Sequence, residues 1–219
     1  MAIHDSIEIL AAIYGPFTEE HRVPESVIDT AENRLGFRLP SALRTLYAET
    51  GEATALHAAH NALVPPYRVD FADDHLVFYE ENQSVVVWGI ERTRLGEEDP
   101  PVDQGQLDQA TGRWTFVSEF ASVSEFACAQ GAWQAVQGGL PFVGVIENHP
   151  YEHLEPMLGP PTVTTNGMSI WVGNGGVALE LPGGYVGLAT QSAAQVSVTS
   201  ARIGLTIDQW DYATLRDEA

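Results

Sequence analysis

The sequence predicts an α+β fold, because segments with helical periodicity are largely separated along the chain from segments with the composition of β-strands. Residues 76–90, LVFYEENQSVVVWGI, place two runs of β-favouring residues on either side of a polar corner. Helical patterns precede this hairpin, and one more follows it. From residue 142 onward, short apolar runs alternate with Gly, Asn and Pro, which is typical of strands joined by tight turns.

Four segments are predicted to be helices. The first covers residues 5–14, where apolar residues recur at helical spacing. The other three are bounded by residues that commonly begin or end helices. These pairs are Pro24 and Gly36, Pro40 and Gly51, and Ser122 and Gly138. Residues 52–66 are predicted to be a loop with a helical turn.

The hairpin at residues 76–90 is predicted to lie centrally in a sheet. Strand alternation places Val86 and Trp88 on one face and Val87 on the other, so both faces are apolar. Asn82 is the expected turn residue, because Asn tolerates positive φ.

The remaining segments divide into strands, loops and ambiguous stretches. Residues 91–109 are charged and rich in turn residues, which predicts an irregular loop, and residues 114–117 predict a strand. Four further strands are expected at 142–146, 168–172, 177–181 and 185–189. Residues 191–205 fit a helix or a strand. The segment around Trp210 and Leu215 is predicted to be a short helix.

The charge of the chain limits the classes of partner. Ten arginines and no lysine stand against thirty acidic residues, which gives a net charge of −20. Nucleic acid binding depends on clustered cationic side chains, so this balance argues against a nucleic acid ligand. A basic protein is the better partner, because a field of this sign attracts cationic proteins. The alternative is an acidic protein whose charge serves only solubility.

Cysteine usage and hydropathy indicate a cytoplasmic protein. The single cysteine, Cys128, excludes an internal disulfide and fits a reducing compartment. The N-terminus lacks the pattern of a secretory signal. No apolar run approaches the roughly 18 residues of a membrane span, so no membrane association is expected.

Candidate metal and nucleophile residues are better explained by structural roles. His149 and His153 are four residues apart, but Pro150 between them disfavours the helix that would align them as ligands. His57 and His60 lack a matching cysteine or carboxylate cluster. Cys128 falls inside a predicted helix as a small buried residue. The Asp73-Asp74-His75 segment is expected to be a turn, and the glycines between Gly173 and Gly187 are expected to serve the hairpin turns at 174–176 and 182–184. We therefore expect no metal and no other cofactor.

Carboxylates gather around the central hairpin. They are Glu80, Glu81, Glu91, Glu97, Glu98 and Asp99. Paired carboxylates perform acid–base chemistry when burial separates their pKa values. A solvated acidic rim is the favoured interpretation, and a carboxylate-dependent hydrolase is the minor alternative.

The middle of the chain resembles the SUKH superfamily, which includes fungal cell-wall regulators and bacterial immunity proteins against polymorphic toxins. The resemblance covers residues 24–136 and rests on motifs in a fixed order. They are LGFRLPSALRTLY at 35–47 followed by Gly51, FYEENQ at 78–83 with Trp88-Gly89-Ile90, Asp99-Pro100-Pro101-Val102 with Trp114, and Ser124-Glu125-Phe126.

The resemblance implies helices packed on a mostly antiparallel sheet, and a binding role without catalysis. It also implies that partner contact comes from the sheet and its loops. In this chain those positions are Glu80, Glu81, Asn82, Trp88, Glu97, Glu98 and Asp99. The alternative for Trp88 and Trp114 is core packing. We expect one domain over residues 1–219, with residues 140–219 as a β-rich C-terminal part.

The leading functional hypothesis is an immunity protein that neutralises a toxin domain by stoichiometric binding. A toxin that acts on nucleic acid carries a cationic groove, which an acidic protein could fill. Two alternatives remain: an intracellular scaffold or regulatory protein on the same fold, and, with less support, the carboxylate-dependent hydrolase.

Overall fold

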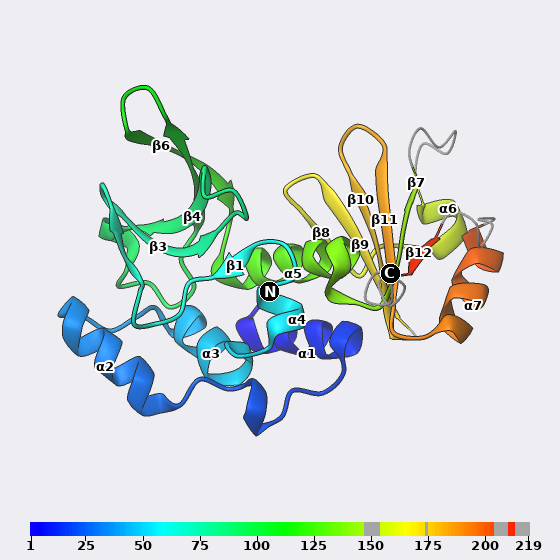
Figure 1. Ribbon diagram of the computed structural model, residues 1–219, viewed down its shortest axis with the longest axis horizontal. Helices are drawn as coiled ribbons and strands as arrows, with labels where there is room; N and C mark the ends of the chain where they lie inside the picture. The colour runs from blue at the N-terminus through cyan, green and yellow to red at the C-terminus, as the bar shows by residue number, and fades with distance from the viewer. Residues whose placement is uncertain (147–153, 174, 204–209, 213–219) are drawn as a thin grey trace, which may run out of the picture. The chain divides into compact units, whose positions relative to one another are not determined.

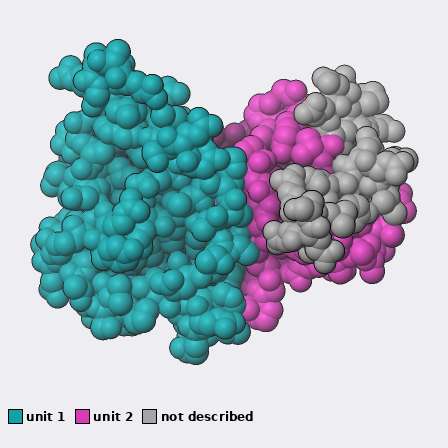
Figure 2. All heavy atoms as spheres, viewed as in Figure 1, with its two compact units in different colours: residues 1–7, 17–127 teal, residues 8–16, 128–219 magenta. Residues whose placement is uncertain are grey.

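The computed structural model describes residues 1–146, 154–173, 175–203 and 210–212 (Figure 1). Within these residues the fold is α+β, with seven α-helices and two antiparallel six-stranded sheets. The chain forms two compact units, residues 1–7 with 17–127 and residues 8–16 with 128–219 (Figure 2). The boundary between them falls inside α1 (Ile3–Tyr14) and inside α5 (Val123–Gln134). The predicted fold class is confirmed.

The first unit contains a helical layer and a sheet. Its helices are α2 (Glu25–Leu35), α3 (Ser41–Thr50), α4 (Thr54–His57) and parts of α1 and α5, with a 3₁₀ turn η1 (Glu19–His21). The predicted boundaries hold for α2, where Gly36 ends the helix at φ 82°. The predicted start holds also for α5, where Ser122 Oγ accepts a hydrogen bond from the Glu125 N–H at 3.1 Å. The α-helix ends at Gln134, before the predicted Gly138, because a π-helical turn follows it.

The first sheet has the strand order β1-β3-β4-β5-β6, with β2 also paired to β3. Its strands are β1 (Ala62–Leu63), β2 (Asp70–Ala72), β3 (His75–Glu80), β4 (Val86–Glu91), β5 (Val102–Asp108) and β6 (Arg113–Phe120). The central hairpin β3–β4 is as predicted. Figure 1 shows α2 and α3 together on one side of β3 and β4, with the tip of the β5–β6 hairpin projecting away from them.

Two predictions about this sheet were wrong. Residues 91–109 are not one irregular loop, because they contain the 3₁₀ turn η2 (Arg92–Arg94) and strand β5. Strand β5 is poor in β-branched residues, but it pairs with β4 on one side and β6 on the other. The positive φ in the β3–β4 turn belongs to Ser84 at 58°, not to Asn82. The loop covers residues 81–85, which is longer than a two-residue turn, and the left-handed residue is its fourth.

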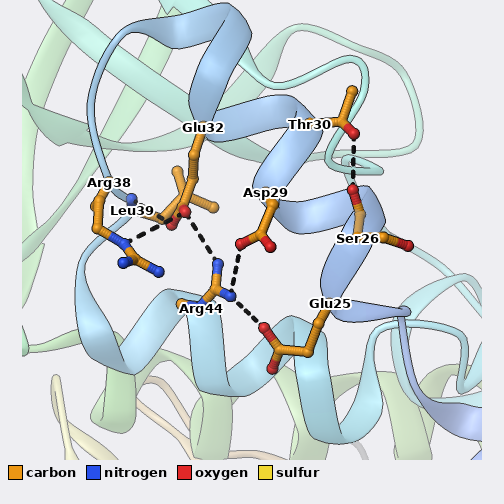
Figure 3. A network of polar contacts seen from close by, with 8 residues as sticks. All are labelled: Glu25, Ser26, Asp29, Thr30, Glu32, Arg38, Leu39 and Arg44. Atoms are coloured by element: carbon orange, nitrogen blue, oxygen red, sulfur yellow. Dashed lines mark hydrogen bonds and ion pairs between the residues drawn. The ribbon is translucent and has the colours of Figure 1, made fainter.

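An ion-pair network joins α2 to α3 (Figure 3). Arg44 on α3 contacts three carboxylates of α2: Glu25, Asp29 at 3.0 Å and Glu32 at 3.0 Å. The Glu32 side chain is buried, and it also lies 3.5 Å from Arg38. Because a buried carboxylate is stable only when it is paired, this network fixes the contact between the two helices.

The second unit contains the other sheet, with the order β12-β7-β11-β10-β9-β8. Its strands are β7 (Phe142–Ile146), β8 (Val163–Thr165), β9 (Met168–Gly173), β10 (Gly176–Leu181), β11 (Tyr185–Thr190) and β12 (Trp210–Tyr212). The described strands after residue 140 therefore form a sheet of their own and do not extend the first sheet. A π-helical turn, η3 (Ala135–Gly139), follows α5, and helices α6 (Glu155–Leu158) and α7 (Ala193–Ile203) complete the unit.

Packing in the second unit resolves the ambiguous C-terminal segments. One face of the sheet packs against residues of α1, α5 and η3, and the other packs against α7 through Val196 and Ile203. Residues 193–203 are thus helical. The helix expected around Trp210 was wrong, because residues 210–212 form β12 and pair with β7. Leu215 lies outside the described residues.

Candidate functional site

The acidic corner, defined as Glu80, Glu81 and Asn82, lies where β3 ends and the turn to β4 begins, with Glu80 as the last residue of β3. Glu80 Oε2 is 3.6 Å from Arg68 Nη2. The Glu81 carboxylate accepts a hydrogen bond from the backbone two residues further on, at 2.9 Å. The amide nitrogen of Asn82 lies 3.3 Å from His60 Nδ1. The corner is accordingly held in place by local contacts, with Asn82 exposed and both glutamates half-buried.

The three acidic residues at 97–99 have different surroundings. Glu97 accepts two hydrogen bonds from Arg94, at 2.8 and 3.1 Å, and these lower the pKa of the Glu97 carboxyl. Glu98 is exposed. Asp99 binds the N–H of Ser124 at 3.0 Å and its hydroxyl at 2.6 Å. Asp99 therefore stabilises the first turn of α5.

The structure does not bring the two acidic groups together. The acidic corner precedes the first residue of β4, and residues 97–99 follow its last residue. Six strand residues span about 20 Å, so the groups lie at opposite ends of β4. A single site that uses all the predicted acidic residues is not formed.

Trp88 does not lie on an exposed surface. Its side chain is 6 % exposed and packs against Tyr79 and Phe126. The indole Nε1–H donates to Glu119 Oε2 at 2.6 Å. Burial raises the pKa of the Glu119 carboxyl, although hydrogen bonds from Trp88 and Gln104 oppose that shift. Trp88 thus belongs to the core, on the face of the sheet that we call the covered face.

The opposite face of the first sheet, here called the open face, carries a row of aromatic side chains. Strand pairing places His75, Asp103, Phe116 and Trp114 on this face, along with the glycines of β4 and β5. The rings of His75 and Phe116 are stacked, with centroids 3.7 Å apart and an interplanar angle of 7°. Trp114 follows, with its ring centroid 6.3 Å from that of Phe116. Both Phe116 and Trp114 are partly exposed.

Two glycines make room for this stack. A Cβ atom at Gly105 would lie 2.5 Å from a ring carbon of Phe116, and one at Gly89 would lie 3.2 Å from Cβ of His75. The two rings therefore lie directly on the backbone of the central strands. Any larger residue at Gly105 would push Phe116 away from the sheet.

The open face is also acidic. His75 Nε2 lies 2.9 Å from Asp103 Oδ2, and Glu91 is directly opposite His75 in the ladder. A hydrogen bond from Arg94 to Glu97 raises the pKa of Arg94, with smaller contributions from Glu91 and Asp103. Carboxylates thus border the aromatic row where it meets η2.

The His75–Asp103 pair has the composition of a general acid–base pair, but its second nitrogen is enclosed. His75 Nδ1 is buried and has no hydrogen-bond partner. Since Nε2 already faces Asp103, a substrate could reach neither nitrogen in this arrangement. The pair orients the imidazole on Phe116.

Sequence reasoning missed the open face as a site. The alternation of Trp114 and Phe116 along β6 was a usable signal, because alternate residues share a face. Asp103 was missed because it fell in a segment predicted to be an irregular loop. Its contact with His75, 28 residues away, depends on strand register.

The other candidate residues occupy structural positions. His57 is buried, and Thr50 Oγ1 lies 3.0 Å from its Nε2. Burial lowers the pKa of His57 to about 3. Cys128 is buried, as predicted, and the Asp73-Asp74 turn joins β2 to β3. His149 and His153 lie outside the described residues. Among the residues that the structure describes, no group of three or more potential metal ligands occurs.

Comparisons with protein-family models, curated proteins and solved structures gave no match. In the part of the chain that the structure describes, none of the helices combines the length and the apolar character needed to cross a bilayer.

Proposed function

We propose that the protein is a non-catalytic binding protein for a basic protein partner, and that it acts as a cytoplasmic immunity protein that neutralises a toxin domain by stoichiometric binding. The observation that carries this proposal is the open face of the first sheet. It combines a partly exposed aromatic row with bordering carboxylates, in a chain of net charge −20.

The composition of the open face supports a protein partner. Aromatic side chains supply much of the binding energy of protein interfaces, particularly near their centre. Trp114 and Phe116 offer such anchors on a sheet face. An arginine or lysine of the partner can lie over an aromatic ring and pair with a carboxylate such as Glu91.

The net charge supports a cationic partner. Electrostatic complementarity raises association rates and disfavours wrong partners. A toxin domain that degrades nucleic acid must hold phosphates, so it presents a cationic surface. The resemblance of residues 24–136 to the SUKH superfamily supports the same class of partner.

The first experiment is affinity capture of the tagged protein from its source cells at low salt, followed by purification of any basic protein that is retained. We expect a complex with one copy of each protein, measurable by light scattering. We also expect the activity of the partner to fall in proportion to the amount of protein added. The association rate should fall steeply between about 10 mM and about 150 mM salt, because the Debye length shortens from about 30 to about 8 Å.

Two variants of β6 locate the interface. Trp114→Ala removes an aromatic side chain of the open face, and Val117→Ala truncates a 58 % exposed side chain of the same strand. Val117 is paired with Gln104, and the Gln104 side chain donates to Glu119 on the covered face. Val117 therefore points away from the open face, which makes Val117→Ala a matched control. We expect Trp114→Ala to weaken binding at least tenfold and Val117→Ala to leave it unchanged. Equal affinities for the two variants, or a retained enzyme substrate in place of a basic protein, would contradict the proposal.

A further inference from the structure

The second unit contains a pocket that the proposed function does not use. Its volume is about 270 Å³, and it lies among β9, β10, β11, helix α7 and residues 158–162. Small residues leave this space open: Ala178 lies beside Trp171 in the ladder, and a Cβ at Gly173 would meet no atom within 4 Å. Helix α7 is anchored to the sheet by Val196 and Ile203, whereas Val198 between them is 59 % exposed. The helix therefore packs on the sheet through one face and lines the pocket with Val198, Thr199 and Arg202.

Most of the wall is apolar, and its polar groups are largely committed to other contacts. The indole N–H of Trp171 donates to the carbonyl of Gly159 at 2.7 Å, so only the ring of this residue faces a ligand. Thr162 Oγ1 accepts from the N–H of Val172 at 3.0 Å. The hydroxyl of Thr199 has no partner among the described residues, and it is available to a ligand.

Arg202 gives the pocket its charge. It lies one helical turn from Thr199, and both residues line the pocket. Its Nη2 donates to the carbonyl of Leu158 at 2.9 Å, and within the described residues it makes no ion pair. It is also the only arginine of the second unit that the structure describes. The remaining guanidinium N–H groups can therefore bind an anion at the mouth of the pocket.

We propose that this pocket binds a small carboxylic acid with an apolar body, of the class of medium-chain fatty acids. The apolar body lies against Trp171 and Ala178, and the carboxylate binds Arg202 and the Thr199 hydroxyl. A water molecule occupies ~30 Å³ in the liquid, and each non-hydrogen atom of a ligand is taken to need about the same space. The pocket volume therefore matches a ligand of about nine non-hydrogen atoms. A guanidinium binds a carboxylate with the geometry of two parallel N–H donors. This site is independent of the partner-binding face of the first sheet.

The test is calorimetric titration of the whole protein with octanoate, with 1-octanol and octylamine as ligands of the same chain length but different charge. About 150 mM salt limits repulsion by distant carboxylates. We expect octanoate to bind at one site and at least tenfold more tightly than octanol, with octylamine weakest. Arg202→Gln should lower the octanoate affinity to that of octanol.

Two further variants control for nonspecific effects. Arg113→Gln removes the same charge from an exposed position of the first unit, and it should leave octanoate binding unchanged. Ala178→Leu fills the pocket and should abolish binding of both octanoate and octanol, with an unchanged circular dichroism spectrum. Because Arg202 is exposed, Arg202→Gln tests the proposal even if Ala178→Leu does not fold. Absent octanoate binding, or equal binding by the wild type and Arg202→Gln, would overturn the proposal.

Discussion

The two faces of the first sheet carry the same kinds of side chain under opposite conditions. On the covered face, Phe126 of α5 contacts Phe78, Tyr79, Trp88 and Phe120, with ring centroids 5.2 to 5.9 Å apart. On the open face, the aromatic row rests on glycine backbone and is partly exposed. An aromatic residue on one face is enclosed by a helix, and on the other it remains available to a partner.

The difference shows how one sheet can separate stability from recognition. Burial of an aromatic side chain contributes strongly to folding, and Trp88 gains in addition a buried hydrogen bond to Glu119. Trp114 contributes less to the stability of the fold than Trp88 does, because its ring remains partly exposed to water. The variants below are ordered by the size of their expected effect on this comparison.

Trp88→Ala should have the largest effect. It removes the ring packed on Tyr79 and Phe126 and leaves Glu119 without its indole donor. Truncation of a buried aromatic residue typically costs about 3–5 kcal/mol of the free energy of unfolding. Urea unfolding followed by circular dichroism measures this loss. A loss below about 1 kcal/mol would show that the covered face does not hold the fold.

His57 should make the free energy of unfolding depend on pH. Its pKa is lowered to about 3 by burial on the covered side, next to Tyr79, whereas an unfolded histidine titrates near 6.5. Between these values the unfolded chain binds a proton that the folded chain does not. Stability is therefore lost as the pH falls below about 6.5, by about 2 kcal/mol at pH 5 and about 3 kcal/mol at pH 4.

The nitrogen of His57 that would take up the proton is the buried Nδ1. Thr50 Oγ1 donates to the carbonyl of Leu46 at 2.8 Å, so His57 Nε2 donates to Thr50, and Nδ1 is left buried without a partner. Urea unfolding at pH 7, 5 and 4 measures the slope. The variant His57→Gln keeps a donor near Thr50 but cannot titrate, so its stability should change less over this range. The same slope in both proteins would assign the effect to other groups.

Local signals in the sequence identified the elements whose ends depend on single residues. Gly36 has the left-handed conformation that ends α2, and Ser122 caps α5 through its hydroxyl. These features depend only on a few neighbouring residues, so they can be predicted from the sequence without knowledge of the fold. Strand β5 was missed because Gly105 and four polar residues weaken its pattern, and its stability comes from pairing on both sides. The strand at residues 210–212 likewise depends on β7.

The candidate site could be predicted only in part, because strand register determines it. The sequence marks Trp88 and Trp114 as equally apolar, and nothing local says which of them α5 covers. Register shifts between Val77 and Tyr79, and between Val102 and Asp103, change which residues share a face. The pairing of His75 with Asp103 follows from this register. Glu81 and Asn82 were correctly placed in a turn, and Glu80 is the last residue of β3. The separation of the acidic corner from residues 97–99 required the strand positions.

Gly105→Ala should have an intermediate effect. The added methyl group would lie 2.5 Å from Phe116 and 2.9 Å from Val87, so the ring must leave its position against His75. Overpacking of this kind costs about 1–3 kcal/mol. Gly96→Ala is the matched control, because a Cβ there meets nothing within 4 Å. Urea unfolding of both variants measures the difference, and equal stabilities would mean that Phe116 does not need this glycine.

Trp114→Ala should have the smallest effect on stability, although it is the same substitution as Trp88→Ala. The ring of Trp114 is partly exposed, and its one ring neighbour is Phe116 at 6.3 Å, among the residues described. We expect a loss within about 1 kcal/mol, measured by urea unfolding under the conditions used for Trp88→Ala. With the partner-binding proposal, the two variants should behave in opposite ways: Trp114→Ala folds but binds poorly, whereas the folded fraction of Trp88→Ala still binds. A large loss of stability in Trp114→Ala would instead make the open face part of the core, and the distinction between the two faces would fail.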